Sequence, residues 1–250
     1  MKVLSPEQAN EFLESSKRDR LYPFFTLSIA SGLRLGEALG VQWRDVDLAK
    51  GELRVRQALQ RQGNELKFVE PKSERSRRLV SLPAFAIEAL KSHQSAQQGE
   101  QLLAGSKWVE SGLVFTSTIG TPFDERNVRR VFKALLKDAD LPPMRLHDLR
   151  HTTATLLLAQ GVHPRVVMET LGHSQISLTL DTYSHVLPGL QADAAKRMQE
   201  ALTIGGQNGC QPPDAAASAA PKESEPGGFL VSRGGIEPPT RRLRVCCSAN

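Results

Sequence analysis

Five polar stretches interrupt the apolar patterns of this sequence, and each contains a side chain capable of acid–base, electrostatic or nucleophilic chemistry. In chain order they are SGLRLGEAL with Arg34, PKSERSRR with Lys72, RLHDLRHTTAT with His147 and Arg150, LGHS with His173, and DTYSHV with Tyr183. Tyr183 is one of only two tyrosines in the chain. A phenol has an ordinary pKa of about 10, so it needs a base or cationic surroundings to act as a nucleophile.

Together these side chains suit the attack of a phenol on a phosphodiester. Two arginines supply planar, permanently charged forks for the non-bridging oxygens as negative charge builds in the transition state. A lysine on a flexible turn can protonate the leaving 5′ oxygen. Arginines and histidines can stabilise this charge without a metal, and the sequence has no Asp, Glu, His or Cys cluster at metal-ligand spacing. We therefore expect neither a metal nor a cofactor.

Each residue taken alone also has a structural interpretation. A surface arginine is usually a solvated charge, and Lys72 in an exposed turn can serve solubility. His173 follows a glycine and can cap helix carbonyls, while Tyr183 can be a half-buried aromatic on a short helix. The other tyrosine, Tyr22, lies in an apolar segment and is assigned to packing. Only the combination of residues favours chemistry.

The composition is typical of a globular protein with a basic surface. The 250 residues are 40% hydrophobic and 24% charged, and the net charge of +5 favours a polyanionic partner. Because only 5% of residues are aromatic, the core is expected to be mostly aliphatic. The three cysteines all lie in the last 41 residues, which argues against a disulfide framework elsewhere. No segment has the pattern of a signal peptide or a membrane span, so the expected location is cytoplasmic.

Apolar periodicity and capping signals predict a mainly helical chain. A capping box formed by Ser5 and Gln8 starts the first helix, and Gly32, Gly161 and Gly172 end later ones. The predicted helices are 5–17, 21–31, 33–41, 83–97, 124–138, 147–160 and 164–171, followed by a short helix around Tyr183 and an Ala-rich helix over 188–202.

The sixth of these helices carries two of the chemical candidates. His147 and Arg150 are spaced i, i+3 and therefore share one helix face. Leu149, Thr153 and Leu156 form the expected buried stripe, so the two polar side chains are predicted to point towards a cleft or solvent.

Three segments alternate charged and apolar residues and are predicted to be strands: Glu52–Ala58, Glu65–Glu70 and Arg78–Pro83. They are expected to pair as an antiparallel meander with one solvated face, with Lys72 in its second connection. The predicted fold class is mainly α with a small three-stranded antiparallel sheet (α+β).

The chain is expected to divide into a folded part, residues 1–203, and a disordered tail, residues 204–250. Residues Gly205–Gly228 contain no Leu, Ile, Val, Phe, Tyr or Trp. Such a segment cannot bury enough apolar surface to offset the entropy lost on ordering.

The five motifs, in this order and together with the Trp43-x-Asp45-Val-Asp47 segment, resemble the tyrosine recombinase (phage-type integrase) family over about residues 3–190. The resemblance implies that this part is the family's catalytic domain. It also implies site-specific cleavage and rejoining of double-stranded DNA, in a phage or other mobile element, through a 3′-phosphotyrosyl intermediate.

The resemblance also implies a role for each motif residue. Tyr183 resembles the nucleophile, Arg34 and Arg150 the phosphate-binding arginines, and Lys72 the general acid. His147 resembles an acid–base histidine and His173 a further phosphate ligand. By the same resemblance, Glu37 supports Arg34.

The expected partner is DNA, bound by a homotetramer in the active complex. Candidate contacts to the DNA backbone lie in two basic clusters: Arg75, Arg77, Arg78, and Arg126, Arg129, Arg130. For the second cluster, a merely solvated face is an equally good interpretation.

The chain departs from the family pattern at its start. Arg34 lies only 33 residues after Met1, which leaves no room for the core-binding domain that family members usually carry before the catalytic one. We expect this domain to be lacking. Two alternatives to a recombinase stay open: a non-catalytic DNA-binding remnant of an integrase, and a nicking-closing enzyme like type IB topoisomerases.

Overall fold

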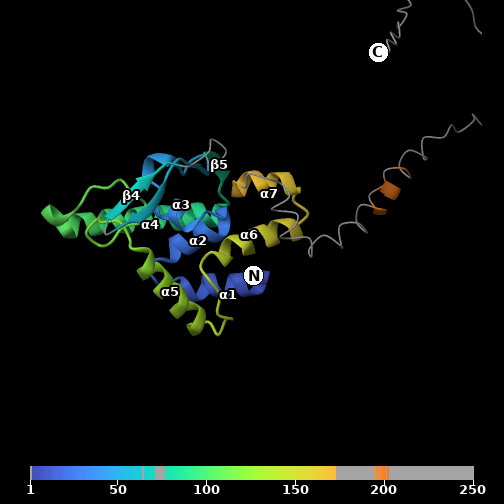
Figure 1. The fold of residues 1–250 in the computed structure, drawn as a ribbon, viewed down its shortest axis with the longest axis horizontal. Coiled ribbons are helices and arrows are strands. Elements are labelled where there is room, and N and C mark those ends of the chain that lie inside the picture. The colour runs from blue at the N-terminus through green and yellow to red at the C-terminus, as the bar shows by residue number, and fades with distance from the viewer. Residues whose placement is uncertain are drawn as a thin grey trace, which may run out of the picture. The chain divides into compact units, whose positions relative to one another are not determined.

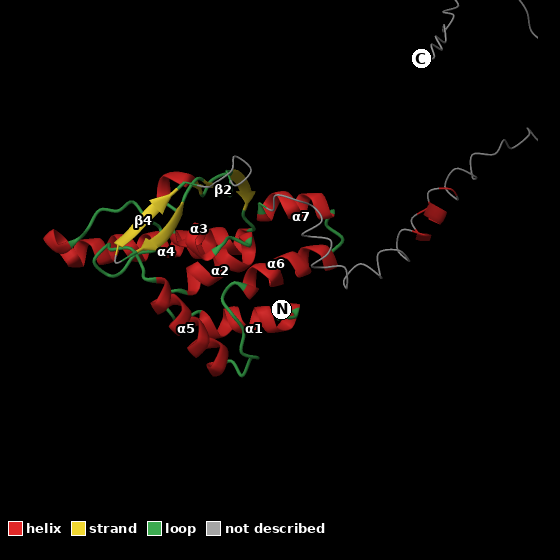
Figure 2. Ribbon diagram, in the orientation of Figure 1, coloured by secondary structure: helices red, strands yellow, loops and turns green. Residues whose placement is uncertain are grey.

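The structure, a computed structural model, describes residues 2–63, 65–70, 77–172, 195, 196, 198–200 and 202. Contacts group Met1–Ile204 into one unit and Gly205–Asn250 into a second, which lies outside the described residues. The first unit is mainly helical (Figures 1 and 2). Its helices are α1 (Pro6–Ser16), α2 (Tyr22–Ser31), α3 (Leu35–Leu39), α4 (Ala84–Ala104), α5 (Glu125–Asp138), α6 (Asp148–Ala159) and α7 (Pro164–Leu171), with short 3-10 turns η1 (Trp43–Asp45) and η3 (Gly105–Lys107).

Helix α2 is the centre of the fold. Eight of its ten residues are buried, as expected for a helix that is apolar on all sides. It packs against α1, α3, α4 and α6. It ends as predicted at Gly32, which has a left-handed backbone (φ 61°). The predicted capping box of α1 is also confirmed, because Ser5 Oγ accepts from the backbone N–H of Gln8 and Gln8 Oε1 accepts from that of Ser5.

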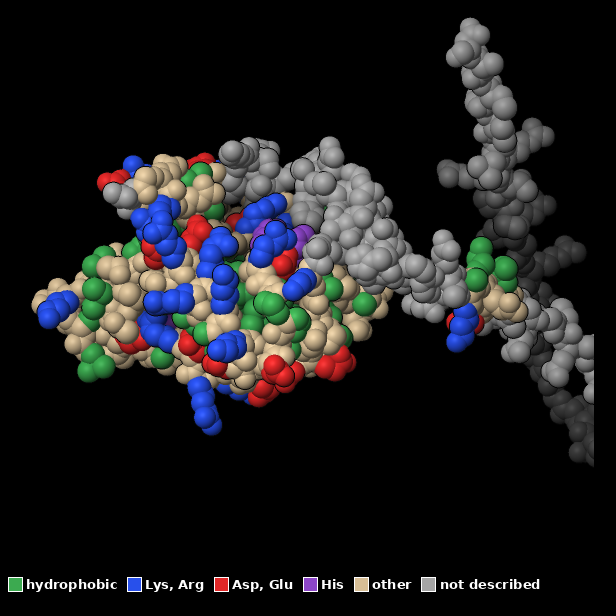
Figure 3. All heavy atoms as spheres, turned by 60° about the horizontal axis from the view of Figure 1, so that its bottom comes forward, with side chains coloured by type: hydrophobic (Ala, Val, Ile, Leu, Met, Phe, Trp, Pro, Cys, Tyr) green, Lys and Arg blue, Asp and Glu red, His purple; other side chains and the backbone are tan. Residues whose placement is uncertain are grey.

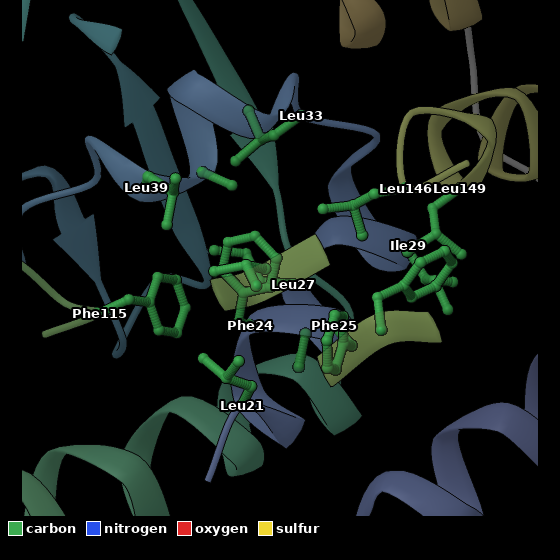
Figure 4. Close-up of a cluster of buried hydrophobic side chains, with 14 of the residues drawn as sticks. Leu21, Phe24, Phe25, Leu27, Ile29, Leu33, Leu39, Phe115, Leu146 and Leu149 are labelled. Carbon is green, nitrogen blue, oxygen red and sulfur yellow. The ribbon is translucent and has the colours of Figure 1, made fainter. Parts of the chain in front are cut away.

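The core is mostly aliphatic, as predicted, but its centre is aromatic. Phe25 packs edge-to-face on Phe12 and on Phe24, with ring centroids 5.3 and 5.5 Å apart, and Phe24 does the same with Phe115 at 5.3 Å. This is a favoured geometry for aromatic pairs. In Figure 4 the phenylalanines of α2 lie between Phe115 on one side and Leu149 on the other. Several of the scarce aromatic residues thus lie where α2 meets its neighbours.

A second, smaller cluster of buried residues joins α6 to α7. It consists of Ala154 and Leu158 from α6 and Val167 and Leu171 from α7. Among the described residues, the buried apolar side chains of α7 thus form a cluster of their own, distinct from the main core.

The predicted meander is wrong in its strand pairing, although an antiparallel three-stranded sheet exists. The strands are β1 (Val46–Asp47), β2 (Glu52–Val55), β3 (Ala58–Gln62), β4 (Glu65–Val69) and β5 (Arg78–Ser81). Strand β2 pairs with β1 and β5, whereas β3 and β4 form a separate hairpin. The predicted first strand is thus divided into β2 and β3.

Contact between β3 and α3 explains this division. A Cβ at Gly36 would lie 2.8 Å from the carbonyl oxygen of Leu59, and one at Gly40 would lie 2.9 Å from the nitrogen of Leu59. The side chain of Gln57 donates to the carbonyl of Gly40 at 3.1 Å. The backbone of β3 therefore rests directly on the glycine face of α3.

Helix α3 is shorter than the predicted 33–41, and the remaining elements follow the predictions closely, with one extension. Helix α4 continues to Ala104, beyond the expected end at 97, and α5, α6 and α7 start and end within one residue of expectation. In the predicted Ala-rich helix, residues 195, 196, 198–200 and 202 are helical. The predicted Tyr183 helix and the tail lie outside the described residues. No described helix is long and apolar enough to cross a membrane.

Replacement of Gly32 by Ala should destabilise the protein more than replacement of Gly161 by Ala. Both glycines have positive φ, 61° and 75°. A Cβ at Gly32 would collide with Leu171 Cδ2, whereas a Cβ at Gly161 would have no other atom within 4 Å. Backbone strain alone costs about 1–2 kcal/mol, and overpacking adds roughly 1–3 kcal/mol. Urea unfolding of both variants measures the difference. Equal free energies of unfolding would contradict the packing argument.

The buried His93 should make stability fall with acid. Its Nε2 bonds to the carbonyl of Val114 at 2.7 Å, and its ring stacks on Phe115. Burial lowers the pKa of His93 below its ordinary value. Because the folded pKa is depressed, the unfolded state binds more protons below about pH 6.5, and stability is lost as the pH falls from there. We expect His93→Gln to show a shallower loss of unfolding free energy between about pH 7 and 5 than the wild type. Parallel pH curves would refute this.

Candidate active site

Arg34 lies at the start of α3 and is held by Glu37 one turn later. The backbone N–H of Arg34 donates to Glu37 Oε2 at 3.0 Å, and its guanidinium donates through Nη1 to Oε1 at 2.8 Å. This confirms the predicted support of Arg34 by Glu37. The Arg34 side chain is 43% exposed, so part of its guanidinium faces outward. Its Nη2 also donates to the carbonyl of Gly172, at 3.3 Å.

Glu37 joins a second arginine that comes from β5. Arg78 donates through Nη2 to Glu37 Oε2 at 2.9 Å, and through Nε to the carbonyl of Thr170 at 2.7 Å. Burial of Glu37 works against its charge, but the bonds from Arg78 and then Arg34 prevail and lower the pKa of Glu37 below its ordinary value. One buried carboxylate therefore connects α3, β5 and the end of α7.

The position of Arg78 does not suit its predicted contact with a DNA backbone. Its side chain is only 6% exposed, because strand alternation sends Arg78 and Val80 to the inner face of the sheet. Sequence reasoning missed this structural role. The available signal was that alternation directs one of two adjacent arginines, Arg77 and Arg78, inward.

Arg150 is also buried, at 3% exposure, which differs from the prediction that it faces a cleft or solvent. Its Nη1 donates to the carbonyl of Gly32 at 2.7 Å. That carbonyl is at the C-terminal end of α2, where the helix dipole favours a cation. Thr153, one turn later, donates to the carbonyl of Ile29 at 2.7 Å. Arg150 is thus fixed against the turn that leads to Arg34.

His147 precedes α6 and is exposed, as predicted for this helix face. Its ring lies edge-to-face on that of His151, with centroids 5.1 Å apart. Partial burial, and then the charge of Arg150, lower the pKa of His147, and the charge of Arg34 acts in the same direction. His147, Arg150 and Arg34 therefore lie within electrostatic reach of one another. A neutral imidazole at neutral pH can either donate or accept a proton.

The end of α7 adjoins this group of cations. Gly172 ends α7 with φ 68°, and a Cβ there would lie 2.8 Å from Arg78 Nη1. The guanidiniums of Arg34 and Arg78 thus converge on Gly172 and on the last turn of α7. Gly172 directly precedes the candidate His173 in the sequence.

Four candidates lie outside the described residues: Lys72, Arg75, His173 and Tyr183. Their roles stay predictions. Within the described residues, no group of three or more His, Cys, Asp or Glu side chains could hold a metal ion.

The other candidate DNA contacts are exposed. Arg126, Arg129 and Arg130 are exposed on α5, and Arg129 pairs with Glu125 at 3.2 Å. Arg77 is exposed and pairs with Glu70 at 2.9 Å. Figure 3 shows Lys and Arg side chains gathered across the middle of one face, close to the histidines.

Comparison with known proteins decides the family. The model of the phage integrase family matches residues 2–189. The chain belongs to this family. It is 37% identical over 212 residues to a XerC-like tyrosine recombinase of Caldanaerobacter subterraneus subsp. tengcongensis, a match that covers 80% of this chain and 54% of that protein. It is 31% identical over 204 residues to the ICEBs1 integrase of Bacillus subtilis, covering 81% and 55%.

Solved structures of this family share the fold. The Tn1549 transposon integrase, in complex with a circular intermediate DNA, superposes with a TM-score of 0.68 at 23% identity over 79% of this chain and 66% of that one. The XerA recombinase gives a TM-score of 0.61 at 24% identity, over 79% and 65%. The predicted fold class is confirmed. The chain spans about half the length of the curated relatives it matches.

Replacement of Glu37 by Gln should strongly destabilise the protein. The change keeps the shape of the side chain but leaves Arg34 and the buried Arg78 without their counter-charge. Loss of one partner from a buried ion pair costs about 3–5 kcal/mol.

Glu169→Gln provides the matched control, because Glu169 forms an ion pair with Arg165 and both side chains are exposed. Such surface pairs contribute at most about 1 kcal/mol. Chemical denaturation of both variants measures the contrast. A loss for Glu37→Gln no larger than that of the control would show that the pair does not hold the site together.

Proposed function

We propose that the chain is the catalytic part of a site-specific DNA recombinase or integrase of a phage or other mobile element. It cleaves and rejoins DNA through a 3′-phosphotyrosyl intermediate and acts in a homotetramer on two duplexes. The proposal is carried by one observation: Arg34, bonded to Gly172, and Arg150, bonded to Gly32, both lie within electrostatic reach of His147. The chain also contains the LGHS and DTYSHV motifs.

The proposed cleavage begins with the phosphate in the positive field of Arg34 and Arg150. The half-exposed guanidinium of Arg34 donates to non-bridging oxygens, while the buried Arg150, fixed by the Gly32 carbonyl, contributes a charge that needs no reorganisation. Preorganised donors of this kind typically contribute factors of about 10²–10³ each in rate.

In this step one bond to phosphorus forms and one breaks, and protein side chains take up one proton and supply another. The phenol oxygen of Tyr183 loses its proton to a base and forms a bond to phosphorus, and the bond from phosphorus to the 5′ oxygen breaks. Lys72 gives a proton to that oxygen, which leaves as a 5′-hydroxyl. His147 suits the acid–base part, because its lowered pKa keeps it neutral near pH 7, and His173 binds a non-bridging oxygen.

The test is formation of a covalent adduct with a nicked suicide DNA that carries the element's own flanking sequence, without divalent metal. A denaturing gel should show a protein–DNA adduct for the wild type and none for Tyr183→Phe. Arg34→Gln should slow adduct formation by about 10²–10³-fold, whereas Arg165→Gln, a surface control, should not.

Two outcomes would count against the proposal. An adduct that persists in Tyr183→Phe would exclude this nucleophile. No adduct by the wild type, even with a core-binding domain fused before Met1, would favour a DNA-binding protein without catalysis.

A further inference from the structure

An arginine-lined hollow of about 580 Å³ lies beside the sheet, next to the buried Glu37 network. Five of its lining residues are Arg44, Arg54, Arg56, Arg77 and Arg78, and the carboxylate among its described lining residues is Glu70. Such an excess of guanidiniums in a concave surface favours an anion, because the low-dielectric walls concentrate the positive field.

Strand alternation explains the position of Arg54 in this hollow. Leu53 and Val55 of β2 are buried, so Arg54, between them, points to the outer face of the sheet. Arg54 lies opposite Leu79 of β5, and Leu79 is 52% exposed. The hollow therefore combines guanidiniums with an apolar floor.

Asp45 forms an ion pair with one of the arginines. Its carboxylate is buried, and it lies 3.1 Å from Nε of Arg56, whose side chain is 54% exposed. Arg56 thus has a buried counter-charge beside it, while about half of its side chain faces the solvent.

The positive charge of the hollow is only partly compensated. Arg56, Arg77 and Arg78 each have a carboxylate partner. In the part of the chain that the structure describes, Arg44 and Arg54 form no ion pair. Both are exposed. Among the described residues, these two guanidiniums have no carboxylate within ion-pair distance.

We propose that this hollow binds the sugar–phosphate backbone of duplex DNA at a phosphate other than the one that is cleaved. Arginine forks match phosphate oxygens, and an exposed leucine between them suits the apolar edge of a deoxyribose. This proposal rests on the proposed function, and it adds a second phosphate site, centred on Arg44, Arg54 and Arg56.

The new site is connected to the active site through one side chain. Arg78 lines the hollow and also donates to Glu37, which holds Arg34. A DNA backbone seated in the hollow is therefore positioned by the same ion-pair network that fixes a phosphate-binding arginine.

The test is the salt dependence of DNA binding by the full chain with Arg44→Gln and Arg54→Gln. Arg56 is left intact, because its removal would leave the buried Asp45 unpaired. Fluorescence anisotropy with a short labelled duplex, between about 50 and 200 mM NaCl, gives the slope of log K against log salt. Each lost phosphate contact should reduce the slope by about 0.9, so the double variant should be shallower by about 1.8.

Two further variants make the result specific. Arg18→Gln with Lys91→Gln removes the same charge from two other exposed positions and should keep the wild-type slope. Arg44→Lys with Arg54→Lys keeps the positive charge and should therefore also keep the wild-type slope. Circular dichroism establishes that all variants are folded.

Equal slopes for the Arg44/Arg54 variant and the Arg18/Lys91 control would overturn this inference. The proposed function would still stand if the wild type forms the Tyr183 adduct. Absence of salt-dependent DNA binding by the wild type would overturn both.

Discussion

A single buried carboxylate, that of Glu37, connects the parts of this molecule that carry the candidate site. It accepts from Arg34 at the start of α3 and from Arg78 of β5, and Arg78 in turn reaches the last turn of α7. A carboxylate so placed loses its hydration, and only excellent geometry and several donors compensate for that loss. The sheet, the α2–α3 turn and α7 are therefore positioned relative to one another by charge as well as by apolar packing.

Hydrogen bonds to backbone carbonyls also keep the guanidiniums of Arg34 and Arg150 close together despite their like charges. Arg150 would repel Arg34 if both were free in a low-dielectric interior. Instead, each is bonded to a backbone carbonyl near a helix C-terminus, Gly32 for Arg150 and Gly172 for Arg34. Helix C-termini carry partial negative charge, so the ends of α2 and α7 moderate the repulsion. A cation cluster built this way is ready for an anion without having to be assembled by it.

Local signals in the sequence predicted the elements well, and long-range pairings less well. The capping box at Ser5 and the glycines that end α2 and α7 are decided by neighbouring residues, so periodicity and spacing find them. The strand order was wrong because the approach of Leu59 to Gly36 and Gly40 depends on tertiary contact.

The candidate site shows the same limit. The motifs identified Arg34, His147 and Arg150, but the burial of Arg150 depends on a carbonyl 118 residues away. Likewise, Arg78 is structural because of a carboxylate 41 residues earlier.

Helix α7 differs from the rest of the fold in how it is attached. Among the described residues, its apolar side chains form a small cluster with Ala154 and Leu158, and hydrogen bonds from Arg78 and Arg34 reach its C-terminal end. Regions with few buried apolar contacts open at a lower free-energy cost than the whole domain. The amides of α7 should therefore exchange with solvent sooner than those of α2. An anion that competes with the Gly172 carbonyl for Arg34 would alter the opening equilibrium of α7.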